Sequence, residues 1–389
     1  MTPGARVAAA ISVLDQVLEG TPAEQSLTRW ARGARYAGSK DRAAVRDHVY
    51  QALRCLRSYS CLGGGRSGRG VMIGALRAAG SDPDEIFTGE GHAPERLSEA
   101  ERQGGARPEA EGDRLDLPDW LVTAFQDSLG DAAEATALAL RSRAPVVLRV
   151  NQRLKTRPEA IDILENDGIH AEGLDIAPTA IVVREGARRI AGSAAYRDGI
   201  VELQDGSSQA AMHALAVAPG SRVLDYCAGG GGKILALAAA TDGTWYAHDA
   251  DPARMKDLPA RAARAGATVT CLSTRDVAAE APYDLVLCDV PCSGSGTWRR
   301  APDAKWRLGP DRLATLIGLQ ADILQQAAGL VRPGGVLAYS TCSILREENE
   351  AQIEKFAEKT DGWKAEFTKR WPVSDAGDGF FLAAFRAPG

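Results

Sequence analysis

The chain has 389 residues, of which 45% are hydrophobic and 25% charged, an ordinary composition for a soluble protein with two or three domains. No apolar run approaches the roughly 20 residues that span a bilayer, and the first helix is too interrupted by acidic residues for a secretory signal. Seven cysteines without a CxxC pair indicate reduced thiols in a cytoplasmic setting and disfavour a structural zinc site.

The net charge of −5 is unevenly distributed along the chain. Residues 1–80 carry 12 Lys/Arg against 5 Asp/Glu, whereas residues 81–119 carry 4 against 12. The basic block could contact nucleic-acid phosphates while the whole chain stays acidic. A solvated basic helix face explains the charges equally well.

Helices are predicted over residues 5–60, because apolar side chains recur there at helical spacing. They are Val7, Ile11, Leu14, Val17 and Leu18, then Val45, Val49, Leu53 and Leu56. Ser39 is expected to cap the second helix, with Asp41 in its first turn. The glycine-rich residues 63–70 predict a break, and a short helix is expected over 71–79.

Residues 81–116 are acidic and rich in Gly and Pro, which predicts a long surface loop or linker. An alanine-rich helix is expected over Trp120–Leu140. Strands at 145–151, 180–184 and 200–204, with a helix at 158–167, then suggest a small α+β subdomain. From Val217 onward strands alternate with helices, as in a doubly wound α/β sheet.

A glycine-rich turn follows the first of these strands, in the sequence RVLDYCAGGGGK that ends at Lys233. Its glycines let a ligand approach the backbone, and the helix that follows favours an anionic group. Asp249 comes 24 residues after Asp225, at the end of the second strand, where an acid typically binds a ribose. Asp276 is expected to end the third strand, close to an adenine. These features fit S-adenosylmethionine as well as NAD, and plain helix caps remain an alternative; a P-loop is excluded by the spacing.

Two later strands each lead into a cysteine. Tyr283–Cys288 reads as a buried strand that ends at Asp289 and is followed by Cys292, and the strand within 331–343 leads to Cys342. One such cysteine alone is usually a small core residue, but two thiols and a carboxylate at carboxyl ends of core strands indicate a site. Cys271 and Cys288 are expected in the core, and Cys227 beside the glycine-rich turn.

The motifs DVPCSGSG and YSTCS resemble the two cysteine motifs of the RNA cytosine-5 methyltransferases of the Sun/Nop (RsmB and NSUN) family. DYCAGGGGK resembles that family's cofactor loop, with Gly230 where the family usually has Pro; Val290 stands in place of its Ala. WRRAPDAKW is similar to the RsmB branch in particular, and GIVELQDGSSQ and DGFFLAAF also match. The resemblance runs from Leu117 to the end, and is weaker over residues 1–75, where SKDRAAVRDHVYQALR resembles part of a NusB-like helical domain.

The resemblance implies four parts: a shortened NusB-like RNA-binding domain (1–80), an acidic linker (81–116), an α+β, RRM-like subdomain (117–208) and a Rossmann-like catalytic domain (209–389). It implies a monomeric RNA methyltransferase that uses S-adenosylmethionine and no metal. The expected substrate is small-subunit ribosomal RNA or another structured RNA.

The resemblance also assigns roles to residues. Cys342 is the expected nucleophile, Cys292 assists release, and Asp289 holds the base. The residues expected to line the cofactor site are Cys227, Ala228, Gly229, Gly230, Gly231, Gly232, Lys233, Asp249, Arg254, Asp276 and Asp289. The candidates for RNA contacts are Arg299, Arg300 and Lys305, whereas Trp298 and Trp306 are expected to pack.

Other functions stay open at this stage. The same chemistry could act on transfer RNA or on another ribosomal site. A non-catalytic RNA-binding assembly factor could keep the fold. A small-molecule or DNA methyltransferase and an NAD dehydrogenase are weaker options, since nothing supplies a hydride-transfer acid–base pair.

Overall fold

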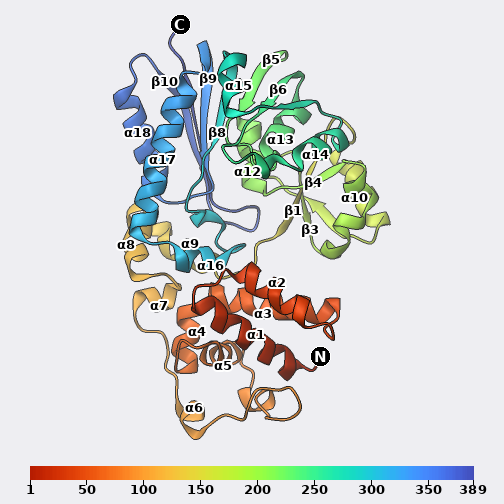
Figure 1. The fold of residues 1–389 in the computed structure, drawn as a ribbon, viewed down its shortest axis with the longest axis vertical. Helices are drawn as coiled ribbons and strands as arrows, with labels where there is room; N and C mark the ends of the chain where they lie inside the picture. The colour runs from red at the N-terminus through yellow and green to blue at the C-terminus, as the bar shows by residue number, and fades with distance from the viewer. The chain divides into compact units, whose positions relative to one another are not determined.

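The computed structural model describes residues 1–389, and its contacts divide the chain into two compact units (Figure 1). The helical unit comprises residues 1–143 and 298–309, and the sheet unit comprises 144–297 and 310–389. The finer four-part division expected from the sequence stays a prediction. None of the helices combines the length and apolar character needed to cross a membrane.

The helical unit is built almost entirely from short helices. They are α1 (Pro3–Leu18), α2 (Ala23–Gly33), α3 (Ser39–Arg54), α4 (Leu56–Gly63), α5 (Gly68–Ala78), η1 (Pro83–Glu85), α6 (Glu99–Gln103), α7 (Glu111–Leu115), α8 (Asp119–Leu129), η2 (Gly130–Ala132), α9 (Ala133–Ala139) and α16 (Pro302–Arg307). The predicted apolar stripes of α1 and α3 form its core, where Leu14, Val45 and Val49 are fully buried. The cap of α3 is Gly38 rather than Ser39, because the Asp41 carboxylate reaches back to the Gly38 amide (3.2 Å).

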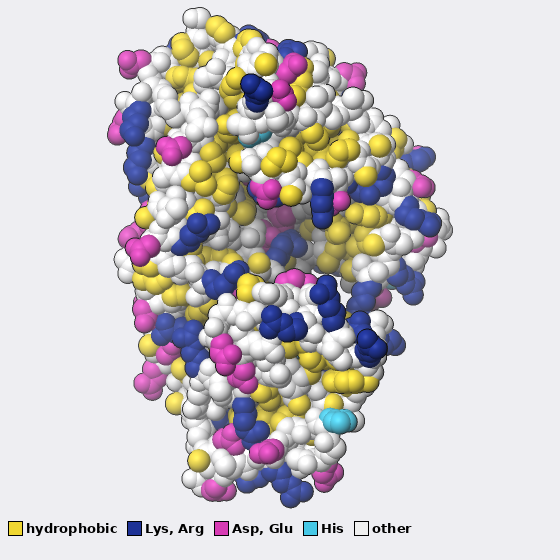
Figure 2. All heavy atoms as spheres, in the orientation of Figure 1, with side chains coloured by type: hydrophobic (Ala, Val, Ile, Leu, Met, Phe, Trp, Pro, Cys, Tyr) yellow, Lys and Arg dark blue, Asp and Glu magenta, His cyan; other side chains and the backbone are white.

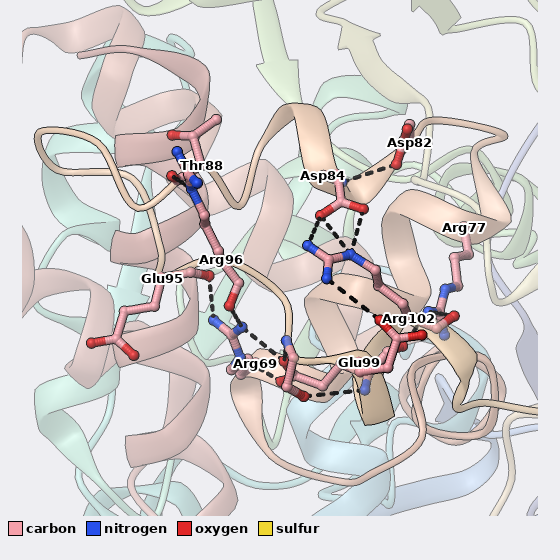
Figure 3. A network of polar contacts seen from close by, with 11 residues as sticks. Arg69, Arg77, Asp82, Asp84, Thr88, Glu95, Arg96, Glu99 and Arg102 are labelled. Carbon is pink, nitrogen blue, oxygen red and sulfur yellow. Dashed lines mark hydrogen bonds and ion pairs between the residues drawn. The ribbon is translucent and has the colours of Figure 1, made fainter.

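Residues 81–116 are more structured than the sequence predicts. Phe87 is fully buried in the helical core, and the Arg69 guanidinium lies 4.8 Å from the centre of its ring. Figure 3 shows the polar network that holds this segment: Arg69 of α5 donates to Glu101 (2.6 Å), and Arg102 pairs with Asp84 (2.9 Å). Three short helices lie in this predicted surface loop or linker, and the segment packs on the helical unit because arginines pair with its acidic residues and one aromatic ring anchors it.

The helix predicted over Trp120–Leu140 is interrupted in the structure. Gly130 adopts a positive φ of 52° between α8 and α9. Glycine reaches this backbone region without steric penalty, so it ends α8 there.

The first sheet of the sheet unit has four strands. They are β1 (Val146–Val150), β2 (Ala171–Gly173), β3 (Ala180–Val183) and β4 (Val201–Leu203), in the antiparallel order β2-β3-β1-β4. The helices α10 (Arg157–Asn166), η3 (Ala187–Gly192) and α11 (Ala194–Arg197) accompany them. The sequence missed β2, a three-residue edge strand too short to show an alternating pattern.

The second sheet carries the site. Its strands are β5 (Ser221–Asp225), β6 (Gly243–Ala247), β7 (Val269–Cys271), β8 (Tyr283–Asp289), β9 (Val331–Thr341), β10 (Lys364–Trp371) and β11 (Phe380–Arg386). Its helices are α12 (Gly206–Ala214), α13 (Gly232–Ala240), η4 (Pro252–Met255), α14 (Leu258–Arg264), α15 (Thr274–Glu280), η5 (Ser295–Thr297), α17 (Pro310–Ala328), η6 (Arg346–Glu348) and α18 (Glu350–Lys359). The strand order β10-β11-β9-β8-β5-β6-β7 confirms the predicted doubly wound sheet, with β10 and β11 antiparallel to their neighbours.

The chain reverses its direction of winding between β5 and β8. From β5 it proceeds to β6 and β7 on one side, and from β8 to β9 on the other. The helices α12, α13 and α14 pack on one face of the sheet and α17 and α18 on the other (Figure 1). A crevice beyond the carboxyl ends of β5 and β8 is therefore the expected ligand position.

Candidate functional site

The glycine-rich turn after β5 is held in a tight, left-handed path. Gly229 and Gly231 have φ values of 50° and 81°, and a Cβ at Gly231 would lie 2.2 Å from Leu258 Cδ1. Only glycine fits such a close approach without strain. Both glycines are buried, so their backbone packs where a side chain would otherwise stand.

Asp249 ties this turn to the end of β6. Its Oδ2 accepts hydrogen bonds from the Gly229 amide (2.9 Å) and the Arg254 guanidinium (2.9 Å), and its Oδ1 accepts one from the Asp251 amide (3.0 Å). The carboxylate is only 4% exposed. Both of its oxygens already serve the turn, so a ribose contact from Asp249 stays a prediction.

Asp276 lies farther from the sheet than predicted. The third strand, β7, ends at Cys271, and Asp276 occupies the first turn of α15, where it accepts a hydrogen bond from the Ser273 hydroxyl (2.6 Å). The expectation that Asp276 ends the strand is wrong, because the chain turns into a helix two residues after Cys271. Its contact with an adenine stays a prediction.

Two charged side chains and a hydroxyl group meet near the ends of β5 and β8. Lys233 Nζ lies 2.6 Å from Asp289 Oδ2, and the Ser340 hydroxyl donates to Asp289 Oδ1 (3.0 Å). Burial disfavours the charge of Lys233, but Asp289 outweighs this and raises its pKa. Lys233 and Asp289 therefore form an ion pair at the centre of the crevice.

Asp225 lies beside that pair. The sequence predicted no role for it beyond its place at the end of the strand, 24 residues before Asp249. Asp225 is 1% exposed, and its Oδ1 has no hydrogen-bond partner. Burial and the neighbouring Asp289 raise the pKa of Asp225 to about 7. A buried carboxylate oxygen without a donor is costly unless a ligand supplies one.

This arrangement fits S-adenosylmethionine, which carries an ammonium group on its amino-acid end. The free oxygen of Asp225 is an acceptor for such a donor. Backbone amides of Cys227 and Ile234 also hydrogen-bond the Asp225 carboxyl and act to lower its pKa, but Oδ1 is left without a partner.

The two cysteines predicted to act together are in contact. Cys292 Sγ and Cys342 Sγ lie 3.4 Å apart, beyond the carboxyl ends of the neighbouring parallel strands β8 and β9. The Gly296 amide donates to the Cys342 carbonyl (2.9 Å) and so joins the two loops. Asp289 sits at the end of β8, three residues before Cys292.

A buried polar network beneath the thiols was not found from the sequence. The Glu348 carboxylate accepts hydrogen bonds from the Ser293 amide (2.7 Å) and from Gln320 (3.0 Å). Asn349 accepts from the Thr341 hydroxyl (2.6 Å) and donates to the Ser343 carbonyl (2.9 Å). In the sequence these residues stand in the run REENE, which reads as a solvated helix start, so composition alone gave no signal.

The remaining cysteines differ in environment. Cys288 is fully buried, as predicted. Cys271 is exposed, and the prediction of a core position is wrong because β7 is an edge strand of the sheet. Cys227 lies in the glycine-rich turn, where burial raises its pKa well above the usual value of a thiol.

The RNA-contact candidates belong to the helical unit, and two of them are buried. Lys305 is 2% exposed and its ammonium donates to the Arg54 carbonyl (3.3 Å), while burial lowers its pKa to about 8. Arg299 is also 2% exposed, and its carbonyl accepts from Arg54 (2.7 Å). The side chains of Lys305 and Arg299 are thus buried in the helical unit, whereas Arg300 is exposed, and RNA contacts of these residues stay a prediction.

Both tryptophans of this segment pack, as expected. Trp298 is 1% exposed and stacks on Phe125 with ring centroids 6.1 Å apart. The Trp306 indole donates to the Leu53 carbonyl (2.7 Å).

Comparison with known proteins agrees with this geometry. Residues 212–386 match the model of the 16S rRNA methyltransferase RsmB/F family, and residues 117–188 match the ferredoxin-like domain of RsmF/B-like methyltransferases. The chain is 33% identical over 307 residues to ribosomal RNA small subunit methyltransferase B of Xanthomonas campestris, covering 74% of this chain and 69% of that protein. It is 34% identical over 299 residues to the probable enzyme of the same name in Bacillus subtilis, covering 70% and 66%. The match spans less than two thirds of the length of several such relatives.

Solved structures share the fold. The crystal structure of PH0851 superimposes with a TM-score of 0.77 at 26% identity and covers 99% of both chains. NSun6 from Pyrococcus horikoshii, solved with SFG, has a TM-score of 0.63 at 18% identity and covers 70% of this chain and 99% of its own.

Proposed function

The chain belongs to the RsmB/F family, and from this premise we propose that it is an S-adenosylmethionine-dependent methyltransferase acting on C5 of a cytosine in 16S ribosomal RNA. The observation that carries the proposal is the contact between two thiols, Cys292 and Cys342, 3.4 Å apart and close to the carboxylate of Asp289. Nothing in ordinary packing requires two cysteines and an ion pair at the same edge of a sheet.

The chemistry of the base explains why a thiol is needed. Cytosine C5 is a weak nucleophile, and addition of a thiolate at C6 moves the electron pair of the C5–C6 double bond to C5. Cys342 forms that bond in the proposal. Asp289 holds the N3 and N4 edge of the base and stabilises the charge that develops there.

Release of the methylated RNA requires that the bond between the Cys342 sulfur and C6 breaks. Once C5 carries the methyl group, its proton leaves to a water molecule. The double bond then re-forms, and the electron pair of the S–C6 bond returns to the Cys342 sulfur. The Cys292 thiol, in contact with that sulfur, assists by donating a hydrogen bond to it as it departs.

The sulfonium of S-adenosylmethionine supplies the methyl group as an electrophile. Asp225 is the proposed acceptor for its ammonium group, and Lys233 and Asp289 line the same crevice. The turn from Cys227 to Gly232 would hold the amino-acid end, and Asp249 with Arg254 and Asp276 remain the proposed contacts for the nucleoside.

A basic surface on the helical unit supports RNA as the partner. Between residues 29 and 42 there are five basic residues and one acidic residue, Asp41, which is already paired with Arg6 (2.8 Å). Figure 2 shows Lys and Arg side chains gathered over α2 and the turn that follows it. We define the basic corner as Arg29, Arg32, Arg35, Tyr36 and Lys40. Its four cations are exposed without a carboxylate partner, and Tyr36 is 74% exposed, open for stacking with an unpaired base.

The first test is methyl transfer from labelled S-adenosylmethionine to unmodified 16S ribosomal RNA. Wild type should label cytosine C5, Cys342→Ala should lose activity by at least about a thousandfold, and Cys292→Ala should accumulate a covalent protein–RNA adduct. Cys271→Ala, an exposed thiol outside the site, is the matched control and should behave as wild type. Labelling of RNA by Cys342→Ala at the wild-type rate would contradict the proposal.

The same assay separates the alternatives. Transfer to tRNA but not to ribosomal RNA would keep the chemistry and change the substrate. Absence of transfer to any RNA, together with retained RNA binding, would instead favour a non-catalytic assembly factor.

A further inference from the structure

Glu348 is a buried charge whose purpose packing does not explain. It is fully buried at the end of η6, and its donors are the Ser293 amide, the Ser293 hydroxyl and the Gln320 amide group, all of them uncharged. A carboxylate without a counter-ion in the interior is costly, and a glutamine could make similar hydrogen bonds without that penalty. A carboxylate at this position therefore indicates an electrostatic role.

The charge lies on one side of the thiol pair. Ser293, which Glu348 holds through its amide and hydroxyl, directly follows Cys292. Toward the other thiol the nearest charges compensate each other, because Lys233 is paired with Asp289 at 2.6 Å. The carboxylate on the Cys292 side has no such counter-ion, so it acts unequally on two sulfurs that are 3.4 Å apart.

We propose that the carboxylate of Glu348 keeps the proton on Cys292, so that the thiolate of the pair forms on Cys342. Glu348 is thus a positioning residue: it touches no reacting atom and decides which of two adjacent thiols serves as the nucleophile. Two thiols in contact cannot both ionise readily, because like charges at this distance repel. Without an asymmetric field, either sulfur could take the charge.

The other ionisable groups around the pair do not reverse this asymmetry. The hydrogen bond with Cys342, burial and the charge of Cys342 raise the pKa of Cys292 well above the usual value of a thiol, and the charge of Glu348 acts in the same direction. Tyr339 of β9 faces Cys292 as a neutral phenol, since burial first and then Cys292 and Glu348 raise its pKa. On the other side Asp289 is paired with Lys233.

This inference deepens the proposed function, but its test needs neither RNA nor cofactor. The intact protein is treated with iodoacetamide across a pH series, and alkylation of Cys292 and Cys342 is followed separately by mass spectrometry. Iodoacetamide is small, and both cysteine residues are half-buried rather than fully buried. In wild type Cys342 should react at a lower pH than Cys292, by about one to two pH units.

Three variants distinguish the effect of the Glu348 charge from the effect of its hydrogen bonds to the loop. Glu348→Gln should shift the pH dependence of Cys292 alkylation to lower pH by about one to two pH units. Glu354→Gln, which removes an exposed carboxylate paired with Arg346, should leave it in place. Gln320→Leu removes a donor that holds both Glu348 and the Pro291 carbonyl but keeps the charge, so it should leave the order of the thiols unchanged.

The outcomes either support or overturn the inference. The inference is supported if the pH dependence of Cys292 alkylation shifts in Glu348→Gln but not in Glu354→Gln or Gln320→Leu. Equal shifts in Glu348→Gln and Gln320→Leu, or no shift in either, overturn it. Should Glu348→Gln fail to fold, the wild-type order decides, because alkylation of Cys292 before Cys342 contradicts the proposed polarity. Because the test does not measure methylation, a negative result leaves the proposed function unaffected. Likewise, a failed methylation assay would not decide which thiol ionises first.

Discussion

At the scale of single residues, Asp225 is proposed to bind the cofactor, and its burial lowers the stability of the folded protein at neutral pH. Its pKa is raised from 3.8 to about 7, so the folded protein holds this proton more tightly than the unfolded chain does. The stability of the ligand-free protein should therefore fall as pH rises from about 4 to about 7, and should stay lower above that range. A ligand that donates a hydrogen bond to the carboxylate would offset this loss of stability.

Asp225→Asn should raise the free energy of unfolding at pH 8 by on the order of 2 to 4 kcal/mol and abolish binding of S-adenosylmethionine. The measurements are urea unfolding at pH 5 and pH 8, and calorimetric titration with the cofactor. Asp284→Asn is the control of opposite sign, since hydrogen bonds from the Arg222 amide and Arg332 outweigh burial and lower the pKa of Asp284. That variant should lose stability at pH 8, and a loss of stability in Asp225→Asn at pH 8 would show that the carboxylate is satisfied without a ligand.

At the scale of elements, glycines set how closely α4 and α5 approach. A Cβ at Gly74 would lie 1.9 Å from the Tyr59 carbonyl oxygen, and one at Gly63 would lie 1.8 Å from the Gly70 carbonyl oxygen. Backbone atoms cannot move aside as a flexible side chain can. The two helices therefore pack backbone against backbone, and the break predicted around residues 63–70 is the tight connection between them.

Gly74→Ala should destabilise the protein by about 2 to 4 kcal/mol. Gly318→Ala is the matched control, because Gly318 also lies inside a helix, α17, but nothing stands within 4 Å of the added Cβ. It should instead stabilise by about 0.5 to 1 kcal/mol, since alanine favours the helix. Thermal unfolding of both variants measures the difference, and equal effects would refute the close crossing.

At the scale of the whole molecule, an acidic protein is proposed to bind RNA through one basic surface. Binding that neutralises phosphates weakens linearly with the logarithm of salt concentration, with a slope near 0.7 to 0.9 per phosphate contact. The net charge of −5 does not oppose this, because the basic corner acts locally and exposed charges farther than about 10 Å are screened at 0.1 M salt.

Replacing Arg29, Arg32, Arg35 and Lys40 together by Gln should reduce the salt slope of 16S RNA binding by about two to four. The measurement is fluorescence anisotropy with labelled RNA at graded salt. The control replaces Arg184, Arg222, Arg332 and Arg386, four exposed arginines already paired with carboxylates, and changes the net charge equally. Equal loss of affinity in both variants would mean that only net charge matters.

The sequence by itself determined the doubly wound sheet and the strand ends that carry Asp289, Cys292 and Cys342. Hydrophobic periodicity and turn residues are local properties, and the carboxyl ends of parallel strands meet at one edge of a sheet. The glycine-rich turn was predicted for the same reason, since its close approach requires glycine at fixed positions.

Only the tertiary structure decided the environment of individual charges. Lys305 and Glu348 both look solvated in the sequence and are buried in the fold, whereas Cys271 looks buried and is exposed on an edge strand. The free oxygen of Asp225 and the contact between the two thiols depend on groups from strands and helices far apart in the chain. Burial and electrostatic potential are sums over neighbours in space, and no local pattern of residues encodes them.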